Sequence, residues 1–446
     1  METQMDMLKD RIKPLYFRYL AAAFGSAMIS SIYGIVDMAM VGQYQGPDGT
    51  AALALVAPVW NIIYSFGLLA GIGGAVLFST LRGSRGTREG DPNEYFTAAL
   101  ALAVGFAALW WVVTAFFDAP LLRLFGASDS LLPLAQRYLL PVKFTVPFFL
   151  FNQMLAAFLR NDGSPALATA GVLAGGIFNI FGDWFFVFAC DMGIFGAGLA
   201  TALGAVITFL VLLVHFFRPH CTLRLVRPRR PLLQMQQIVV TGFSTFFIDL
   251  AMGILTMLFN RQIMHYIGTD ALAVYGIIVN ISTVVQCCGY SVGQAAQPLI
   301  SQNYGAQAWG RIRETLRCAL GAAAVFSLVW TALILAVPNG FVYVFMAPTE
   351  SVLAIAPAIL RSYGISFLLL PFNIFSTYYF QSLMMPGTAL AVSVARGMVV
   401  SGALICLLPA LVPAALWFAM PLTELLVAGY AAWQMVRSTR ALGKPA

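Results

Sequence analysis

Long apolar stretches recur along the whole chain, and short polar segments separate them. Each stretch reaches the length of about 20 residues that an α-helix needs to cross the hydrocarbon core of a bilayer. The pattern predicts roughly twelve membrane-spanning helices and leaves little of the chain for a soluble domain. The predicted fold class is therefore all-α, a polytopic membrane protein. We expect spans at 14–42, 51–81, 94–118, 130–159, 164–188, 194–217, 233–265, 271–303, 312–338, 350–383, 387–410 and 412–436.

Composition supports the same interpretation. Hydrophobic residues make up 60% of the 446 residues and charged residues only 10%, with a mean hydropathy of +0.84. A soluble protein of this size needs more polar residues to cover its surface. The six cysteines are scattered and show neither paired zinc-ligand spacing nor a C-x-x-C motif, so we expect no metal site of those kinds.

The basic residues are distributed unevenly between alternate connections. If the N-terminus is cytoplasmic, the inside segments hold the clusters around 9–18, 82–88, 218–230, 311–317 and 437–444, while the opposite side holds little more than Arg123. This asymmetry predicts a multi-pass protein of the plasma membrane, the cytoplasmic membrane in a bacterium, with both termini in the cytoplasm. It also explains the net charge of +7 without a nucleic-acid partner.

The chain is interpreted as two similar halves. Residues 218–232 form the longest polar interruption, with five arginines and three prolines, and we expect a basic cytoplasmic linker there between an N-terminal six-helix lobe (1–217) and a C-terminal six-helix lobe (233–446). Residues 49–74 and 268–293 align without a gap and share eight identities. Because six helices return the chain to the same side, the repeats would be parallel, with a central cavity between pseudo-symmetric lobes that rock to give alternating access.

Three aspartates interrupt the apolar stretches. Asp37, Asp183 and Asp249 each lie deep within a predicted span, where a carboxylate is expensive unless it lines a polar cavity, binds a cation or carries a proton. Asn179 precedes Asp183 by four positions and so shares its helical face. Asp37 lies at a comparable height on the first span. Two facing carboxylates favour a shared proton or monovalent cation. The alternative is that each is a structural residue bonded to a neighbouring helix.

Further polar residues within the spans are candidates for lining a substrate cavity. Asp249 could hold a positive charge of the substrate, although a neighbouring basic residue could equally neutralise it. Arg396 and Glu424 lie at matching depths and are expected to form a buried ion pair. The substrate-cavity candidates are Tyr33, Asn152, Gln153, Asp249, Asn280, Gln294 and Gln297.

Motifs of other function classes are missing from the sequence. His215, His220 and His265 do not form an H-E-x-x-H motif, so an enzyme is not expected. The glycines at 71–74 lie within a span and lack the strand–turn–helix context of a phosphate loop. We therefore expect no cofactor and no metal other than a possible sodium ion at Asp37, Asn179 and Asp183.

Several segments resemble the multidrug and toxic compound extrusion (MATE) family, most closely its prokaryotic DinF-like and MepA-like branch. They are YGIVDMAMVG at the end of the first span, RNDGSP at 160–165, NIFGDWFF with GIFGAGLAT at 193–201, and GQAAQPLISQNYGA at 293–306. The resemblance implies a proton or cation site in the N-terminal lobe made by Asp37, Asn179, Asp183 and Thr201. One position departs from the family pattern, because Ala22 stands where many relatives carry a proline.

The expected function is secondary active antiport. Amphipathic, often cationic drugs or metabolites would leave the cell in exchange for protons or sodium ions. The alternative is a lipid-linked saccharide flippase of the same superfamily, which would need more basic residues in its cavity to hold pyrophosphate. The expected partners are small substrates and the lipid bilayer, with no nucleic acid and no obligatory protein partner.

Overall fold

The computed structural model describes residues 6–84, 90–345 and 349–443, and these residues form helices and connecting segments without a strand. Among them, 11 helices are long and apolar enough to cross a membrane, and one bent helix pair would supply a twelfth span. The predicted all-α, polytopic fold is confirmed. The chain divides into two compact units, one made of residues 6–10 and 21–246 and the other of residues 11–20 and 247–443.

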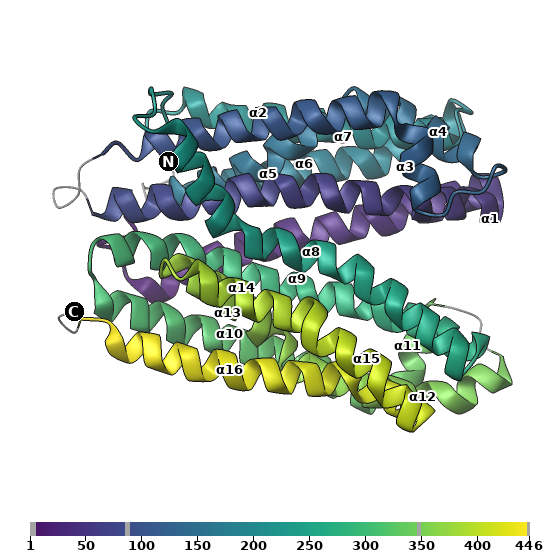
Figure 1. The fold of residues 1–446 in the computed structure, drawn as a ribbon. Helices are drawn as coiled ribbons and strands as arrows, with labels where there is room; N and C mark the ends of the chain where they lie inside the picture. Colours follow the sequence, from purple (N-terminus) through teal and green to yellow (C-terminus); the bar gives the residue numbers. More distant parts are fainter. Residues whose placement is uncertain (1–5, 85–89, 346–348, 444–446) are drawn as a thin grey trace. The chain divides into compact units, whose positions relative to one another are not determined.

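The N-terminal unit contains the first six candidate spans apart from residues 12–20, and its helices are coloured from purple to teal in Figure 1. The first helix, α1, is divided by Gly46, whose φ of 67° and ψ of −154° end one span and allow the next to begin. Its elements are α1 (Ile12–Gly83, of which residues 12–20 belong to the C-terminal unit), α2 (Asn93–Phe116), α3 (Asp118–Leu124), α4 (Leu132–Lys143), α5 (Val146–Asn161), α6 (Pro165–Asp183), the π-helix η1 (Trp184–Ala189), α7 (Ile194–Leu213) and the 3₁₀-helix η2 (Val214–Phe217).

The fourth expected span, 130–159, differs from a single straight helix. The chain forms α4 and α5 there, and the two are bent by 59° across a break after Lys143. Pro147 lies in the first turn of α5, where its missing N–H leaves no intrahelical bond unmade. Because of the bend, α4 runs in a different direction from α5, and it packs against α7.

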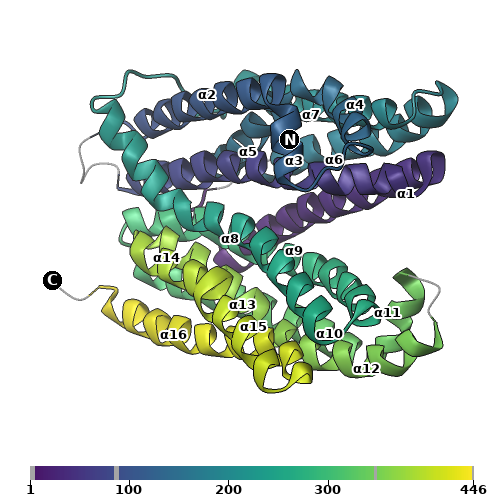
Figure 2. The ribbon, with the colours of Figure 1, turned by 45° about the vertical axis from the view of Figure 1, so that its right-hand side comes forward.

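The C-terminal unit contains the remaining spans, and within it α9 packs against α10 and α13 (Figure 2). Short π- and 3₁₀-segments interrupt several of its helices. Its elements are α8 (Pro231–Tyr266, whose first half belongs to the N-terminal unit), α9 (Thr269–Gly305), α10 (Trp309–Ala336), α11 (Pro338–Phe345), α12 (Glu350–Gly364), η3 (Ile365–Leu368), α13 (Leu370–Ser382), α14 (Pro386–Val394), η4 (Ala395–Val399), α15 (Val400–Leu411), η5 (Pro413–Phe418) and α16 (Ala419–Ala441).

A glycine contact sets the spacing of α6 and α7. A Cβ atom added at Gly175 of α6 would collide with the carbonyl oxygen of Gly204 and the hydroxyl of Thr208, both on α7. Only glycine therefore allows the two backbones to approach this closely. The close approach brings Asn179, one turn further along α6, within hydrogen-bond reach of Thr201 on α7.

Candidate functional site

A group of polar side chains lies buried where four helices of the N-terminal unit meet. Tyr138 of α4 donates its hydroxyl hydrogen bond to Oδ2 of Asp37 on α1, at 2.9 Å, and its oxygen lies 3.2 Å from the hydroxyl of Thr201 on α7. Nδ2 of Asn179 on α6 donates to the Thr201 hydroxyl at 3.1 Å. Asp183, the next residue on the same face of α6, is within electrostatic range of Asp37. We call these five residues the aspartate site.

Four oxygen atoms of the aspartate site are buried and accept no hydrogen bond from the described residues. They are Oδ1 of Asp37, Oδ1 of Asn179 and both carboxylate oxygens of Asp183. Asp183 is 0% exposed, Asn179 3% and Asp37 7%. Buried carboxylate oxygens without a partner are unfavourable because they have lost their hydration without gaining a hydrogen bond or a counter-charge. The site therefore calls for a positively charged or protonated occupant.

The chemistry of the site suits a proton or a small hard cation. All four free acceptors are oxygens, the ligand type that hard cations prefer. Among the described residues, no lysine or arginine forms an ion pair with Asp37 or Asp183. Two like charges in a low-dielectric interior repel each other, so one proton or one monovalent cation would relieve both the repulsion and the desolvation.

The structure brings together all four residues that the sequence and the family resemblance assigned to a coupling site. It adds Tyr138, which sequence analysis missed. A tyrosine in an apolar span carries no formal charge, and the sequence does not show which neighbouring helix its hydroxyl will face. The weak signal available was a polar hydroxyl inside a span that also contains Pro141.

The other N-terminal candidates take separate positions. Tyr33 lies one turn before Asp37 on α1, and its hydroxyl is 3.1 Å from that of Tyr64 on the second half of α1. Asn152 is buried and donates from Nδ2 to the carbonyl oxygen of Ala205, which fixes α5 to α7. Gln153 is half-buried beside it.

The C-terminal candidates are distributed along α8 and α9. Asp249 accepts a hydrogen bond at 2.9 Å from the hydroxyl of Tyr290. Asn280 is exposed in a cavity of about 340 Å³, whereas Gln297 is buried and donates to Ser301 at 3.3 Å, and Gln294 is half-buried. The cavity is lined by Thr256, Asn260, Leu272, Tyr275, Gly276, Val279 and Asn280.

The expected ion pair between Arg396 and Glu424 is confirmed. Nε of Arg396 donates to Oε1 of Glu424 at 2.8 Å, and Nδ2 of Asn373 donates to Oε2 at 2.5 Å. Glu424 is fully buried, and Arg396 lines a crevice of about 40 Å³ that shares Thr256 with the larger cavity. Both oxygens of Glu424 are occupied, in contrast to those of Asp183.

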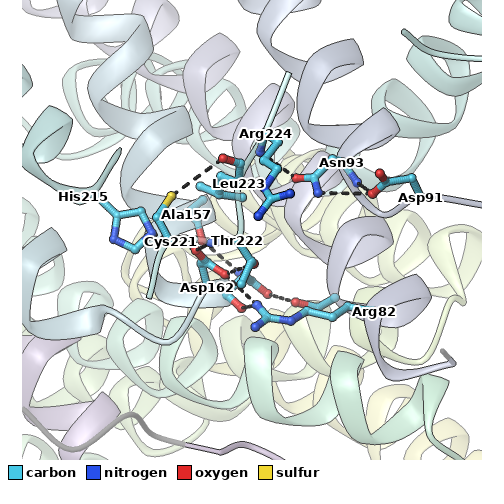
Figure 3. A network of polar contacts seen from close by, with 12 residues as sticks. Arg82, Asp91, Asn93, Ala157, Asp162, His215, Cys221, Thr222, Leu223 and Arg224 are labelled. Atoms are coloured by element: carbon cyan, nitrogen blue, oxygen red, sulfur yellow. Dashed lines mark hydrogen bonds and ion pairs between the residues drawn. The ribbon is translucent and has the colours of Figure 1, made fainter. Parts of the chain in front are cut away.

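A further buried carboxylate, Asp162, lies in the turn between α5 and α6 (Figure 3). It accepts hydrogen bonds from Arg82 at 2.7 Å, from His215 Nε2 at 2.8 Å, and from both the backbone N–H and the hydroxyl of Thr222. Burial raises the pKa of the carboxyl, but the bonds from His215 and Thr222 and the charge of Arg82 outweigh it, so the net pKa is lowered.

Asp162 also belongs to the donor group with metal-ligand spacing among the described residues. Its ligand atoms and those of His215 and Cys221 lie within 4.8 Å of one another. The Arg82 guanidinium already supplies positive charge to the carboxylate, and the Cys221 thiol is directed to the carbonyl oxygen of Leu223. The arrangement fits a structural hydrogen-bond centre better than a cation site, because an incoming cation would have to displace the arginine.

Charged side chains buried among membrane-spanning helices usually mark a binding site or a path for ions or substrates. The MatE family model matches this chain twice, at residues 22–185 and 244–407, so the chain belongs to this family and is a membrane transporter rather than an enzyme. One match falls in each half, in agreement with the internal duplication predicted from the sequence.

Curated relatives and solved structures agree with this assignment. The multidrug export protein MepA of Staphylococcus aureus (strain NCTC 8325 / PS 47) is 25% identical over 338 residues, which cover 75% of this chain and 73% of MepA. MepA of Staphylococcus saprophyticus is 27% identical over 62% of this chain and 61% of its own length.

Among solved structures, an outward-facing multidrug resistance MATE family transporter of the MOP superfamily aligns over 100% of both chains, with a TM-score of 0.89 and 20% identity. A MATE structure in the straight conformation aligns over 98% of both chains, with a TM-score of 0.90 and 19% identity. These likenesses establish the fold.

Proposed function

We propose that this protein is a secondary active antiporter that exports amphipathic, often cationic drugs or metabolites in exchange for protons or sodium ions. The observation that carries the proposal is the aspartate site, where two buried carboxylates leave three oxygens without a hydrogen-bond partner. Membership of the MatE family and the multidrug export named for the staphylococcal relatives support the export of drug-like compounds.

In the proposed mechanism, Asp37, Asn179, Asp183 and Thr201 hold the coupling ion. Tyr138 acts as a positioning residue, because its hydroxyl orients one oxygen of Asp37 and leaves the other free. Loading the site changes its charge and so favours one of two conformations of the transporter, while substrate favours the other. Alternating access then links inward ion flow to outward substrate movement.

Substrate recognition is proposed for the polar and aromatic residues outside the aspartate site. These residues form one group in each unit, and their aromatic rings can hold organic cations by cation–π contact. The candidates remain Tyr33, Asn152 and Gln153 in the N-terminal unit and Asp249, Asn280, Gln294 and Gln297 in the C-terminal unit. We also propose that both termini lie in the cytoplasm of a cell whose plasma membrane holds the protein, as the basic segments indicate.

The test is efflux from proteoliposomes loaded with ethidium, with a proton gradient and a sodium gradient imposed separately. Wild type is compared with Asp183→Asn and with Asp129→Asn, a matched control whose side chain is 91% exposed. Efflux that follows one gradient and fails only in Asp183→Asn supports the antiporter and identifies its ion. If the folded wild type shows no efflux under either gradient, the proposal is wrong.

The second candidate function is the lipid-linked saccharide flippase. A pyrophosphate group needs unpaired basic side chains, whereas Arg396 is held by Glu424 and the aspartate site is acidic. These observations favour the antiporter. Flipping of a fluorescent polyprenyl-pyrophosphate saccharide without ethidium efflux would favour the flippase over the antiporter.

A further inference from the structure

The basic linker that follows η2 is held against the N-terminal unit by hydrogen bonds from its backbone. Its backbone N–H groups at Thr222, Arg224 and Val226 donate to side-chain oxygens of Asp162, Asn93 and Thr97, at 2.9, 2.9 and 3.1 Å. The donors are alternate residues, which is the spacing of an extended chain whose N–H groups face one side. The linker is therefore held in one conformation.

The acceptors that hold the linker are themselves fixed. The Asp162 carboxylate also binds Arg82 and His215, and the Asn93 side chain and backbone N–H both donate to Asp91 (Figure 3). Glu94 accepts the backbone N–H of Arg229 at 3.1 Å and the amide of Gln234 at 2.7 Å. A network of this kind loses less conformational entropy on binding a ligand than a free loop would.

The fastened linker leaves a cationic surface exposed. The side chains of Arg224, Arg227 and Arg230 are exposed, and among the described residues the structure shows no ion pair for any of them. Among the acidic side chains of this network, Asp162 binds Arg82 and Glu94 binds Nε of Arg229 at 3.3 Å, whereas Asp91 accepts hydrogen bonds from Asn93. Three guanidinium groups that form no ion pair with the described residues therefore lie within one stretch of seven residues, 224–230, whose backbone is held by hydrogen bonds.

The same surface carries exposed apolar side chains where the linker joins its two spans. Phe217, the last residue of the span Ile194–Phe217, is 87% exposed, and Leu232, the second residue of the span Pro231–Tyr266, is 81% exposed. Leu225 is 69% exposed between them. Because both ends of the linker continue into membrane spans, the linker lies at the depth where headgroups meet acyl chains.

We propose that Arg224, Arg227 and Arg230 form a binding surface for the headgroups of anionic phospholipids, with Phe217, Leu225 and Leu232 against the acyl region. Guanidinium groups bind phosphate oxygens through paired hydrogen bonds, and the apolar residues select a phosphate that carries acyl chains over free phosphate. This surface is separate from the aspartate site and extends beyond the proposed transport function.

The test measures binding of phosphatidylglycerol to the full-length protein in nanodiscs of phosphatidylcholine, with fluorescent lipid as the probe. The triple variant Arg224→Gln/Arg227→Gln/Arg230→Gln is compared with Arg313→Gln/Arg317→Gln/Arg437→Gln, which removes the same charge from exposed positions elsewhere. We expect roughly fivefold weaker binding for each linker arginine removed. Equal losses in the two triple variants would show a general charge effect and overturn the proposal.

Two further arms test the geometry and the identity of the ligand. Thr97→Val removes the acceptor for the Val226 N–H without changing any charge, and we expect it to weaken phosphatidylglycerol binding because the array loses its fixed spacing. Unchanged binding in this variant would contradict the proposal that the hydrogen-bonded backbone of the linker sets the spacing of the three arginines. Inorganic phosphate at millimolar concentration should not displace the lipid; complete displacement would assign the surface to free phosphate and refute the lipid proposal.

Discussion

Replacing Asp183 by asparagine should remove ion coupling while keeping the fold. Asp183 is fully buried, and neither of its carboxylate oxygens accepts a hydrogen bond from the described residues. Asparagine has nearly the same shape but no charge. The substitution therefore takes away the attraction for a cation or proton without breaking any hydrogen bond that the structure shows.

The size of the effect follows from Coulomb's law. A unit positive charge about 4 Å from the carboxylate gains about 4 kcal/mol at an effective dielectric constant of about 20. Losing this attraction weakens ion binding by about a thousandfold, since about 1.4 kcal/mol corresponds to a factor of ten. At any ion concentration that half-saturates the wild type, the variant would be essentially empty, and its transport would no longer follow the gradient.

The assay is initial ethidium efflux at a fixed ion gradient, with protein insertion and orientation measured for each variant. We expect Asp183→Asn to fall to the rate of empty liposomes and Asp129→Asn to retain the wild-type rate, because the Asp129 side chain is 91% exposed and forms a surface ion pair with Arg123. Gradient-driven efflux by Asp183→Asn within twofold of wild type would exclude Asp183 from coupling.

Three further predictions address the other buried polar groups. Tyr138→Phe should shift the ion dependence of efflux by roughly tenfold to a hundredfold, because a hydrogen bond to a charged group contributes about 1.5–3 kcal/mol. Losing this bond destabilises the ionised Asp37 carboxylate and so favours uptake of a proton, whereas Tyr343→Phe at an exposed position should not change the ion dependence of efflux. Because the pKa of Asp162 is lowered, the stability that its carboxylate contributes is present above the ordinary carboxyl range near pH 4 and is lost as the pH falls through the lowered pKa. In Asp162→Asn, acid unfolding monitored by circular dichroism should therefore lack the pH dependence that this carboxylate contributes. An acid-unfolding profile identical to that of wild type would contradict the network. Glu424→Ala should lower the free energy of unfolding by about 3–5 kcal/mol by leaving Arg396 buried without its partner, and Arg396→Met/Glu424→Leu should recover much of the loss in thermal unfolding; equal losses in both would argue against the ion pair as the cause.

The membrane spans were predictable because the bilayer fixes their length and excludes unpaired backbone groups. The division of α1 at Gly46 was also visible in the sequence, where glycine and proline follow the first apolar stretch. The buried aspartates were identified for the same reason: a charge in hydrocarbon is expensive enough to be informative by itself.

Contacts between helices were harder to predict. The hydrogen bond from Tyr138 to Asp37 joins residues 101 positions apart, and Tyr138 lies on α4, which is bent by 59° from α5. The linker shows the same limit, because the sequence marks it as basic and polar but does not reveal that Asn93, Thr97 and Asp162 accept its backbone N–H groups. Such bonds are set by tertiary packing and leave no periodic signal.

The geometry of the aspartate site depends on residues that never touch an ion. Gly175, Asn179 and Asp183 are spaced by four along α6 and so share one face. At Gly175 the backbones of α6 and α7 are in contact, and one turn further along α6 the helices remain close enough for Asn179 to bond the Thr201 hydroxyl at 3.1 Å. A side chain at position 175 would separate the helices and lengthen that bond. The glycine therefore holds Asn179 of α6 within bonding distance of Thr201 on α7, which orients the amide whose oxygen is left free in the site.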